Sequence, residues 1–183
     1  MGDGHSNIWR YGFMSDFWVF GYGSLIWNPG FSLLERRRAR LHGLHRSLCI
    51  RSWVHRGTQE NPGLVLGLDK GGSCYGIAMR VSGADKEPVI EYLRARELVT
   101  SVYLETWRKI WLDNGERVPA LVYRADPKHP QYAKGLSLDE QTSIVRGSRG
   151  RSGPNDEYVR ETVAAMKDHE ITDHALEYIA RNL

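Results

Sequence analysis

The chain has 183 residues, of which 41% are hydrophobic, and a formal net charge of +3. This length predicts one domain with a sizeable core over residues 17–183, preceded by a poorly ordered tail over residues 1–16. The small positive charge falls short of the balance typical of nucleic-acid-binding proteins. No apolar run approaches the ~20 residues needed to cross a bilayer, and residues 1–16 lack the pattern of a secretory signal, so we expect a cytoplasmic protein without a membrane partner.

The first half of the chain shows the pattern of a run of antiparallel strands. Residues 17–21 predict a buried strand that ends in a glycine turn, and Asn28-Pro29-Gly30 predicts a loop. Further strands are expected at 43–52, 64–68 and 74–81, with turns at Asn61-Pro62-Gly63 and at residues 70–73 between them. Four arginines at positions 36, 37, 38 and 40 form the densest basic run, and because no aromatic residues interleave it we interpret it as a solvated face.

The pattern then becomes helical and returns to strand. Residues 85–97 predict a helix capped by Asp85, with Val89, Ile90, Leu93 and Glu97 on one face. Strands at 102–112 and 117–124 are partly apolar on both faces, which favours a closed or strongly curved sheet.

The last third reads as helical. Helices are predicted from Ser137 to Val145, from Asn155 to His169 with Asn155 as the cap, and from Thr172 or Asp173 to the end. The fold class expected is α+β, a small mixed β-barrel flanked by helices with a helical C-terminal third.

Two groups of residues that often bind metals give no such signal here. Cys49 and Cys74 fit no metal or redox spacing and read as reduced, structural residues. His42 and His45 lie three residues apart in a predicted strand, which places them on opposite faces, so we expect no metal site.

The segment Gly21-Tyr22-Gly23-Ser24-Leu25 carries the first functional signal. It lacks the third glycine of a dinucleotide fingerprint and the Gly-Lys-Ser/Thr ending of a P-loop. What remains is a turn with two residues that lack Cβ, able to adopt positive φ and to direct several N–H groups at one oxygen. The alternative is an ordinary turn at the end of a strand.

Glu97 carries the second signal, because it lies on the apolar face of its predicted helix. Burial there, together with the negative end of the helix dipole, raises the pKa of a carboxyl group. The alternative is an exposed Glu97 that pairs with Arg94 or Arg96, and the pattern by itself leaves both interpretations open.

Five segments together resemble the ChaC-like γ-glutamylcyclotransferases, which degrade glutathione. They are VFGYGSLIW, RGTQENPGLVLGL, GGSCYGIA, the helix end RARE followed by LVTSVY, and SGPNDEYV, and the resemblance runs from about Phe17 to about His169. It implies a β-barrel flanked by helices, no cofactor, and Glu97 as the catalytic base. It also implies that the γ-glutamyl group binds to the segment made up of Val19, Phe20, Gly21, Tyr22, Gly23, Ser24 and Leu25.

The expected reaction is the conversion of glutathione to 5-oxoproline and cysteinylglycine, with Glu97 acting as base and then as acid. Arg51, which can clamp a carboxylate, and Tyr158, at the start of a helix, are further candidates for substrate binding. One alternative is the same chemistry on other γ-glutamyl amino acids or amines. A second is a non-enzymatic binding or regulatory module that uses the basic runs at 36–40 and 146–151.

Overall fold

The computed structural model describes residues 15–183, and within them five strands close into a barrel in the order β1-β3-β2-β4-β5. β1 pairs antiparallel with β3 and parallel with β5, so the barrel is mixed. The expected α+β barrel is therefore confirmed, whereas most of the predicted tail lies outside the described residues. The barrel strands are β1 (Phe17–Gly21), β2 (Glu35–Ser52), β3 (Gly63–Val81), β4 (Tyr103–Leu112) and β5 (Arg117–Ala125).

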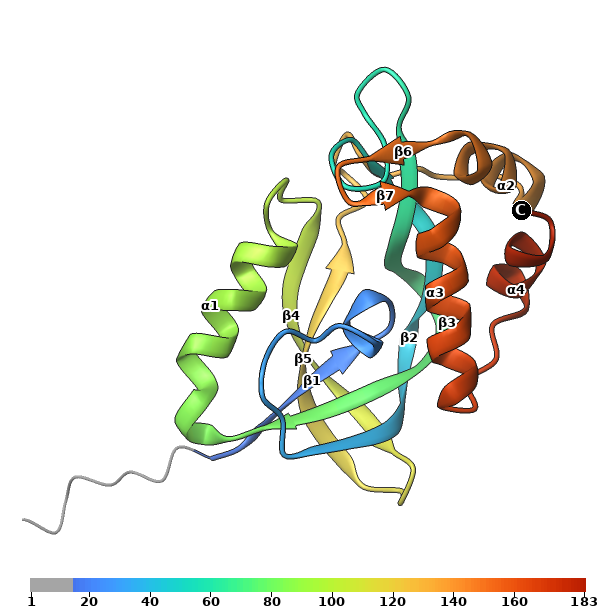
Figure 1. Cartoon of the computed structure of the whole chain (residues 1–183). Helices are drawn as coiled ribbons and strands as arrows, with labels where there is room; N and C mark the ends of the chain where they lie inside the picture. Colours follow the sequence, from blue (N-terminus) through green and yellow to red (C-terminus); the bar gives the residue numbers. More distant parts are fainter. Residues whose placement is uncertain (1–14) are drawn as a thin grey trace, which may run out of the picture.

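Helices flank the barrel on two sides (Figure 1). α1 lies beside β4, joined to it by an ion pair between Arg94 and Glu105 at 2.8 Å, and the three C-terminal helices pack together on the side of β3. No helix formed by residues 15–183 has the length and apolar character needed to cross a bilayer. The α-helices are α1 (Lys86–Glu97), α2 (Leu138–Gly147), α3 (Asn155–Asp168) and α4 (His174–Arg181); the short elements are η1 (Ser24–Ile26), η2 (Gly83–Asp85), β6 (Arg149–Gly150) and β7 (Gly153–Pro154).

The predicted turn at residues 70–73 is wrong, because β3 continues through it. Gly71 and Gly72 do have positive φ, at 101° and 62°, and they lie where the ladder with β2 shifts register between His42 and Leu44. A bulge and a chain reversal use the same glycine-rich composition, so sequence alone could not separate them. β2 likewise begins at Glu35, eight residues before the predicted strand.

Two of the four predicted helix starts are confirmed by their caps. The Ser137 hydroxyl accepts from the Glu140 N–H, and the Glu140 carboxylate accepts in return from the Ser137 N–H, which is a capping box. Asp173 caps α4 by accepting from the Leu176 N–H.

Asn155 is not a cap, and that prediction was wrong. It is the first residue of α3, and its fully buried side chain accepts from the Leu64 N–H at 2.7 Å and donates to the Leu64 carbonyl at 2.8 Å. Asn155 thus ties the start of α3 to β3. Asp85 precedes α1 as expected, but its side chain makes no capping bond within the described residues.

Candidate active site

Gly21, the last residue of β1, and Gly23, in the turn that follows, have different surroundings. A Cβ on Gly21 would lie 2.8 Å from Met79 Cε and 3.2 Å from Leu25 Cβ, so this glycine faces tightly packed core side chains that would have to shift. A Cβ on Gly23 would instead lie 3.6 Å from the Tyr158 hydroxyl and 3.5 Å from Leu66 Cδ1, in the space beside the turn. Neither glycine is among those with positive φ, so the turn does not use that freedom.

The turn presents consecutive backbone donors. Ile26 N–H bonds to the Gly23 carbonyl at 2.9 Å and closes η1. Within residues 15–183, the N–H groups of Gly23, Ser24 and Leu25 donate no hydrogen bond. Three successive free donors are suited to an anionic or carbonyl oxygen.

Glu97 is the last residue of α1, and its side chain is only 17% exposed. Burial raises the pKa of this carboxyl group, and Arg96 partly offsets the rise. The carboxylate Oε1 lies 3.2 Å from Arg96 Nε. Glu97 therefore faces inward as the first interpretation expected, and only the Arg96 partner of the alternative is found, because the paired carboxylate is not exposed.

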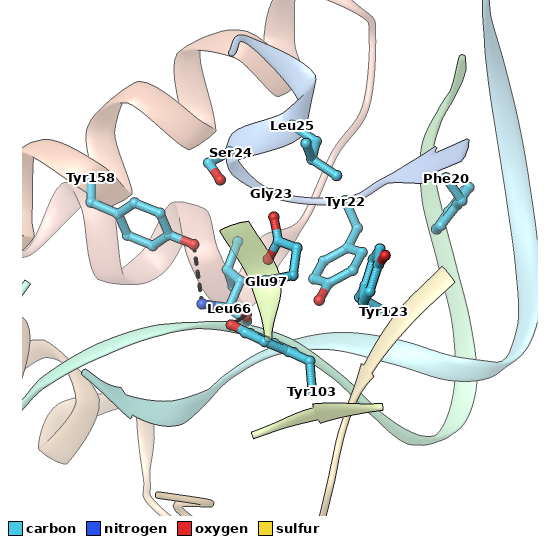
Figure 2. A pocket seen from close by; sticks show the side chains of 10 residues that line it. All are labelled: Phe20, Tyr22, Gly23, Ser24, Leu25, Leu66, Glu97, Tyr103, Tyr123 and Tyr158. Carbon is cyan, nitrogen blue, oxygen red and sulfur yellow. Dashed lines mark hydrogen bonds between the residues drawn. The ribbon is translucent and has the colours of Figure 1, made fainter. Parts of the chain in front are cut away.

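Glu97 and the glycine turn line the same pocket, of about 40 Å³ (Figure 2). Five of the seven residues expected to bind the γ-glutamyl group lie in its wall. Val19 and Gly21 do not, because the Val19 side chain is fully buried in the core and Gly21 packs against Met79. The lining residues are Phe20, Tyr22, Gly23, Ser24, Leu25, Leu66, Glu97, Tyr103, Tyr123 and Tyr158.

Tyrosine hydroxyls surround Glu97, and two of them bind the backbone of Leu66. Tyr158 accepts from the Leu66 N–H at 3.1 Å, and Tyr103 donates to the Leu66 carbonyl at 2.7 Å. Burial raises the pKa of Tyr158 to about 12 and that of Tyr103 well above its usual value, so both hydroxyls are protonated near neutral pH. Sequence reasoning missed Tyr103 and Tyr123; the available signals were the two predicted strands after the helix of Glu97, which contain them.

Arg96 joins the acid to the turn, a role that sequence reasoning also missed. Its guanidinium donates to the Ser24 hydroxyl at 2.9 Å and to the carbonyl of Asn28, in the loop after the turn. It also donates to the Tyr92 hydroxyl at 3.2 Å. Through these bonds the end of α1 is held against the loop, and Glu97 is kept beside the turn.

The pocket adjoins an open groove of about 540 Å³, with which it shares Ser24, Glu97, Tyr103 and Tyr158. Arg51 lines this groove, and its guanidinium makes no hydrogen bond or ion pair with any other described residue. Arg56 lines it too, but donates to the Pro154 carbonyl at 3.0 Å. The groove is therefore a cationic extension of the pocket, with Arg51 available to a ligand.

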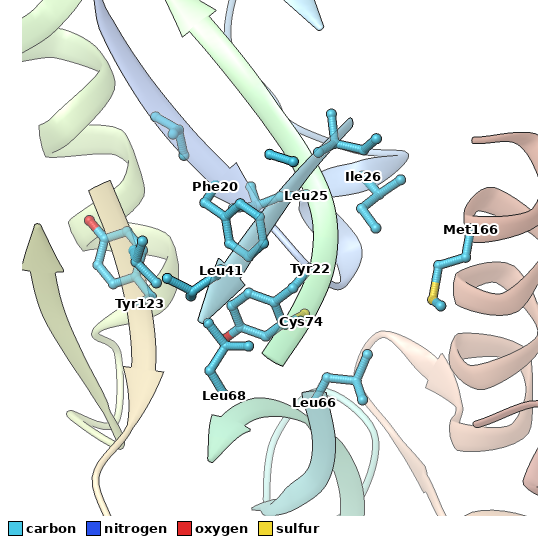
Figure 3. Packing of buried hydrophobic residues seen from close by; sticks show 14 of the residues in the cluster. Phe20, Tyr22, Leu25, Ile26, Leu41, Leu66, Leu68, Cys74, Tyr123 and Met166 are labelled. Atoms are coloured by element: carbon cyan, nitrogen blue, oxygen red, sulfur yellow. The ribbon is translucent and has the colours of Figure 1, made fainter. Parts of the chain in front are cut away.

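The floor of the pocket is continuous with the core of the barrel. Figure 3 shows Phe20, Tyr22 and Tyr123 among the packed side chains of Leu41 and Leu68. A close-packed floor holds the site rigid and keeps bulk water from beneath Glu97. Cys49 and Cys74 are buried and free, and residues 15–183 contain no group of three or more His, Cys, Asp or Glu side chains that could hold a metal ion.

Residues 17–183 match the family of ChaC-like proteins over nearly the whole chain. The chain belongs to this family. The resemblance drawn from the five sequence segments is thus confirmed, and the glycine turn and Glu97 of this ChaC-like chain lie together in its pocket.

Relatives with named activities match most of the ChaC-like chain. It is 37% identical over 142 residues to the glutathione-specific gamma-glutamylcyclotransferase of Escherichia coli (strain K12), covering 78% of this chain and 62% of that protein. The chain thus spans less than two thirds of the length of that relative. It is 32% identical over 171 residues to the glutathione-specific gamma-glutamylcyclotransferase of Schizosaccharomyces pombe, covering 82% of each.

A solved structure shares the fold. The crystal structure of a yeast γ-glutamyl cyclotransferase specific to glutathione superposes with a TM-score of 0.83 at 24% identity. The superposition covers 92% of this chain and 95% of that one, which supports the same barrel for both.

Proposed function

We propose that this chain is a glutathione-specific γ-glutamylcyclotransferase, which converts glutathione to 5-oxoproline and cysteinylglycine. The observation that carries the proposal is the buried carboxyl group of Glu97 in one pocket with three free backbone donors of the glycine turn. The activities named for the relatives from Escherichia coli and Schizosaccharomyces pombe support the choice of substrate.

The nucleophile in this reaction belongs to the substrate. The α-amine and the γ-carbonyl of glutathione lie in the same glutamyl residue, so attack closes a five-membered ring and breaks the bond to the cysteinyl nitrogen. Intramolecular reactions gain a large advantage from proximity once the reacting atoms are aligned. The pocket, which encloses little space, serves to curl the glutamyl group into that alignment.

Glu97 takes a proton from the α-ammonium group and then returns a proton to the departing cysteinyl nitrogen. An ordinary glutamate with a pKa of about 4.3 and an α-amine of about 8 differ by roughly 3.7 units, or about 5 kcal/mol of uphill proton transfer. Burial raises the pKa of Glu97 and so narrows this gap.

The glycine turn stabilises the oxygen on which negative charge develops. Backbone donors directed at such an oxyanion contribute about 3 kcal/mol each to transition-state stabilisation. Tyr158 accepts from the Leu66 N–H, which leaves its own hydroxyl proton to donate to the α-carboxylate of the glutamyl group.

Arg51 is proposed to bind the glycyl carboxylate at the other end of glutathione. It lines the groove that leaves the pocket, and its guanidinium has no partner among the described residues. An arginine can bind a carboxylate through two parallel hydrogen bonds.

We also propose that residues 17–183 act as one domain, because strands and helices from both halves of the chain line the pocket. We further propose that the protein acts in the cytoplasm, where thiols stay reduced.

The test is to incubate the purified chain with glutathione and to measure 5-oxoproline and cysteinylglycine. γ-Glutamylalanine serves as the comparison substrate, because it shares the glutamyl end and lacks the cysteinylglycine end. We expect turnover of glutathione to be preferred, and Arg51→Met to raise KM for glutathione by about tenfold, the loss of one charged contact. Equal turnover of both substrates would favour the wider substrate range, and no 5-oxoproline from either would contradict the proposal.

A further inference from the structure

Arg46 of β2 is a buried arginine that reaches the glycine turn from outside the pocket. Its side chain is 3% exposed, and its Nε donates to the Tyr22 carbonyl at 2.6 Å. Its two remaining nitrogens donate to the Tyr75 carbonyl in β3 and to Asp173 Oδ2, at 3.1 Å. Arg46 does not line the pocket, so it does not contact the substrate proposed to bind there.

The carbonyl of Tyr22 and the N–H of Gly23 belong to one peptide unit. In a planar trans peptide the C=O and N–H bonds point in opposite directions. A guanidinium that holds the Tyr22 carbonyl on one side of the chain therefore turns the Gly23 N–H toward the other side. Gly23 lines the pocket and Arg46 does not, which is the arrangement expected if the Gly23 N–H faces the pocket.

Asp173 holds Arg46 and caps the last helix at the same time. Its Oδ1 accepts from the Leu176 N–H at 3.1 Å, and its Oδ2 pairs with Arg46. Buried charges are costly unless they are paired and hydrogen-bonded, and here every nitrogen of the guanidinium has an acceptor. The start of α4 is thus joined through one arginine to the turn after β1.

We propose that Arg46, held by Asp173, is a positioning residue that orients the Gly23 N–H toward the reacting oxygen and makes α4 a support of the active site. The proposal rests on the function proposed above for the catalytic step. The orientation of the Gly23 peptide is independent of the proposed function, because it can be measured without substrate.

The kinetic test compares three variants with a matched control. Arg46→Met removes all three bonds, Arg46→Lys keeps the charge, and Asp173→Asn keeps the cap of α4 but loses the charged partner. The control is Arg38→Met, because Arg38 also lies on β2 and pairs with Glu170, before α4, at 3.0 Å, but the pair is exposed.

We expect Arg46→Met to lower kcat by about 10²–10³, the loss seen when one oxyanion donor is removed, with little change in KM. Arg46→Lys recovers part of this activity, Asp173→Asn loses about tenfold, and Arg38→Met retains wild-type kcat. A merely structural role for Arg46 would lower Tm and leave the kcat of the folded protein unchanged.

Amide NMR of the substrate-free protein supplies a second readout. The Gly23 resonance should move in Arg46→Met and Asp173→Asn and stay in place in Arg38→Met. If wild type turns over glutathione, a kcat within about twofold of wild type in folded Arg46→Met overturns the proposal. If Arg46→Met does not fold, a kcat of Asp173→Asn within about twofold of wild type overturns the proposal.

If wild type does not turn over glutathione, the proposed function fails on that result alone. The Gly23 resonance then decides the positioning role separately. A resonance that moves in Asp173→Asn and not in Arg38→Met supports the role, and an unchanged resonance overturns it.

Discussion

The carboxylate of Glu97 and the guanidinium of Arg96 are ion-paired neighbours at the end of α1, with 3.2 Å between Oε1 and Nε. Arg96 also donates to the Ser24 hydroxyl at 2.9 Å, so one side chain contacts both the acid and the glycine turn. Despite this cation, burial keeps the pKa of Glu97 raised. Arg96 thus holds Glu97 beside the glycine turn, and the carboxyl group of Glu97 binds its proton more tightly than an ordinary glutamate does.

Glu97→Gln should abolish most of the turnover and leave the fold intact. The amide is nearly isosteric with the carboxyl group but cannot act as a base, and general acid–base catalysis contributes about 10²–10⁴ in rate. Release of cysteinylglycine from glutathione measures the loss. The control is Glu91→Gln, an exposed residue of the same helix, which should keep wild-type activity. Normal turnover by Glu97→Gln would show that another group is the base.

The pH profile of kcat/KM should report the raised pKa of Glu97. A base acts only when ionised, so activity rises with pH through the pKa of Glu97, which lies above the ordinary value of about 4.3. Arg96→Met removes the cation that lowers this pKa, and the acidic limb should then move to higher pH. Arg94→Met, which removes an exposed pair with Glu105 on the same helix, should leave the limb in place.

The stability of the protein should depend on Glu97 with a definite sign. Its pKa is higher in the folded than in the unfolded chain, so the folded state binds the proton more tightly. The resulting stabilisation is full below the unfolded pKa of about 4.3 and is lost as pH rises through the folded pKa. Glu97→Gln lacks this dependence. The Tm of Glu97→Gln should therefore rise relative to the Tm of wild type as the pH increases from 4 to neutral. A difference in Tm that does not change with pH would contradict burial of an ionised Glu97.

Tyr158→Phe should reduce both stability and substrate binding. Without the hydroxyl, the buried Leu66 N–H loses its acceptor, which costs about 1–3 kcal/mol of the free energy of unfolding. The α-carboxylate of the substrate loses a donor as well, so KM should rise. Urea unfolding and steady-state kinetics measure the two effects. Tyr75→Phe, at an exposed position of β3, is the matched control and should change neither.

Asn155→Ala should destabilise the fold more than any surface change. It leaves the Leu64 N–H and C=O without partners inside the protein, at about 1–3 kcal/mol for each group. We therefore expect a loss of roughly 2–6 kcal/mol in the free energy of unfolding. Asn114→Ala removes exposed hydrogen bonds in a turn and should cost less than about 1 kcal/mol. Similar losses in the free energy of unfolding for both variants would contradict a stabilising role for the buried hydrogen bonds between Asn155 of α3 and Leu64 of β3.

The sequence alone predicted the features that depend on local pattern. Alternation of apolar residues indicated the barrel strands, and the spacing of Val89, Leu93 and Glu97 placed the acid on the apolar face of its helix without deciding whether it is buried. The motif of the glycine turn indicated backbone donors, and its residues carried the resemblance to the family. These features are encoded locally because side-chain periodicity and turn composition follow from the backbone conformation of a short segment.

Only the tertiary structure decided which groups meet. A Cβ on Gly21 would meet Met79 in the core, whereas a Cβ on Gly23 would lie beside Leu66 and the Tyr158 hydroxyl at the pocket, and no local pattern separates the two. Asn155 reads as a cap in the sequence, yet it binds Leu64, 91 residues away. Nothing in the local sequence distinguishes Arg46 and Arg96 from other polar residues, yet both side chains donate hydrogen bonds to the glycine turn. Such roles depend on the distance between elements remote in the chain, which is set when the barrel closes and its helices pack against it.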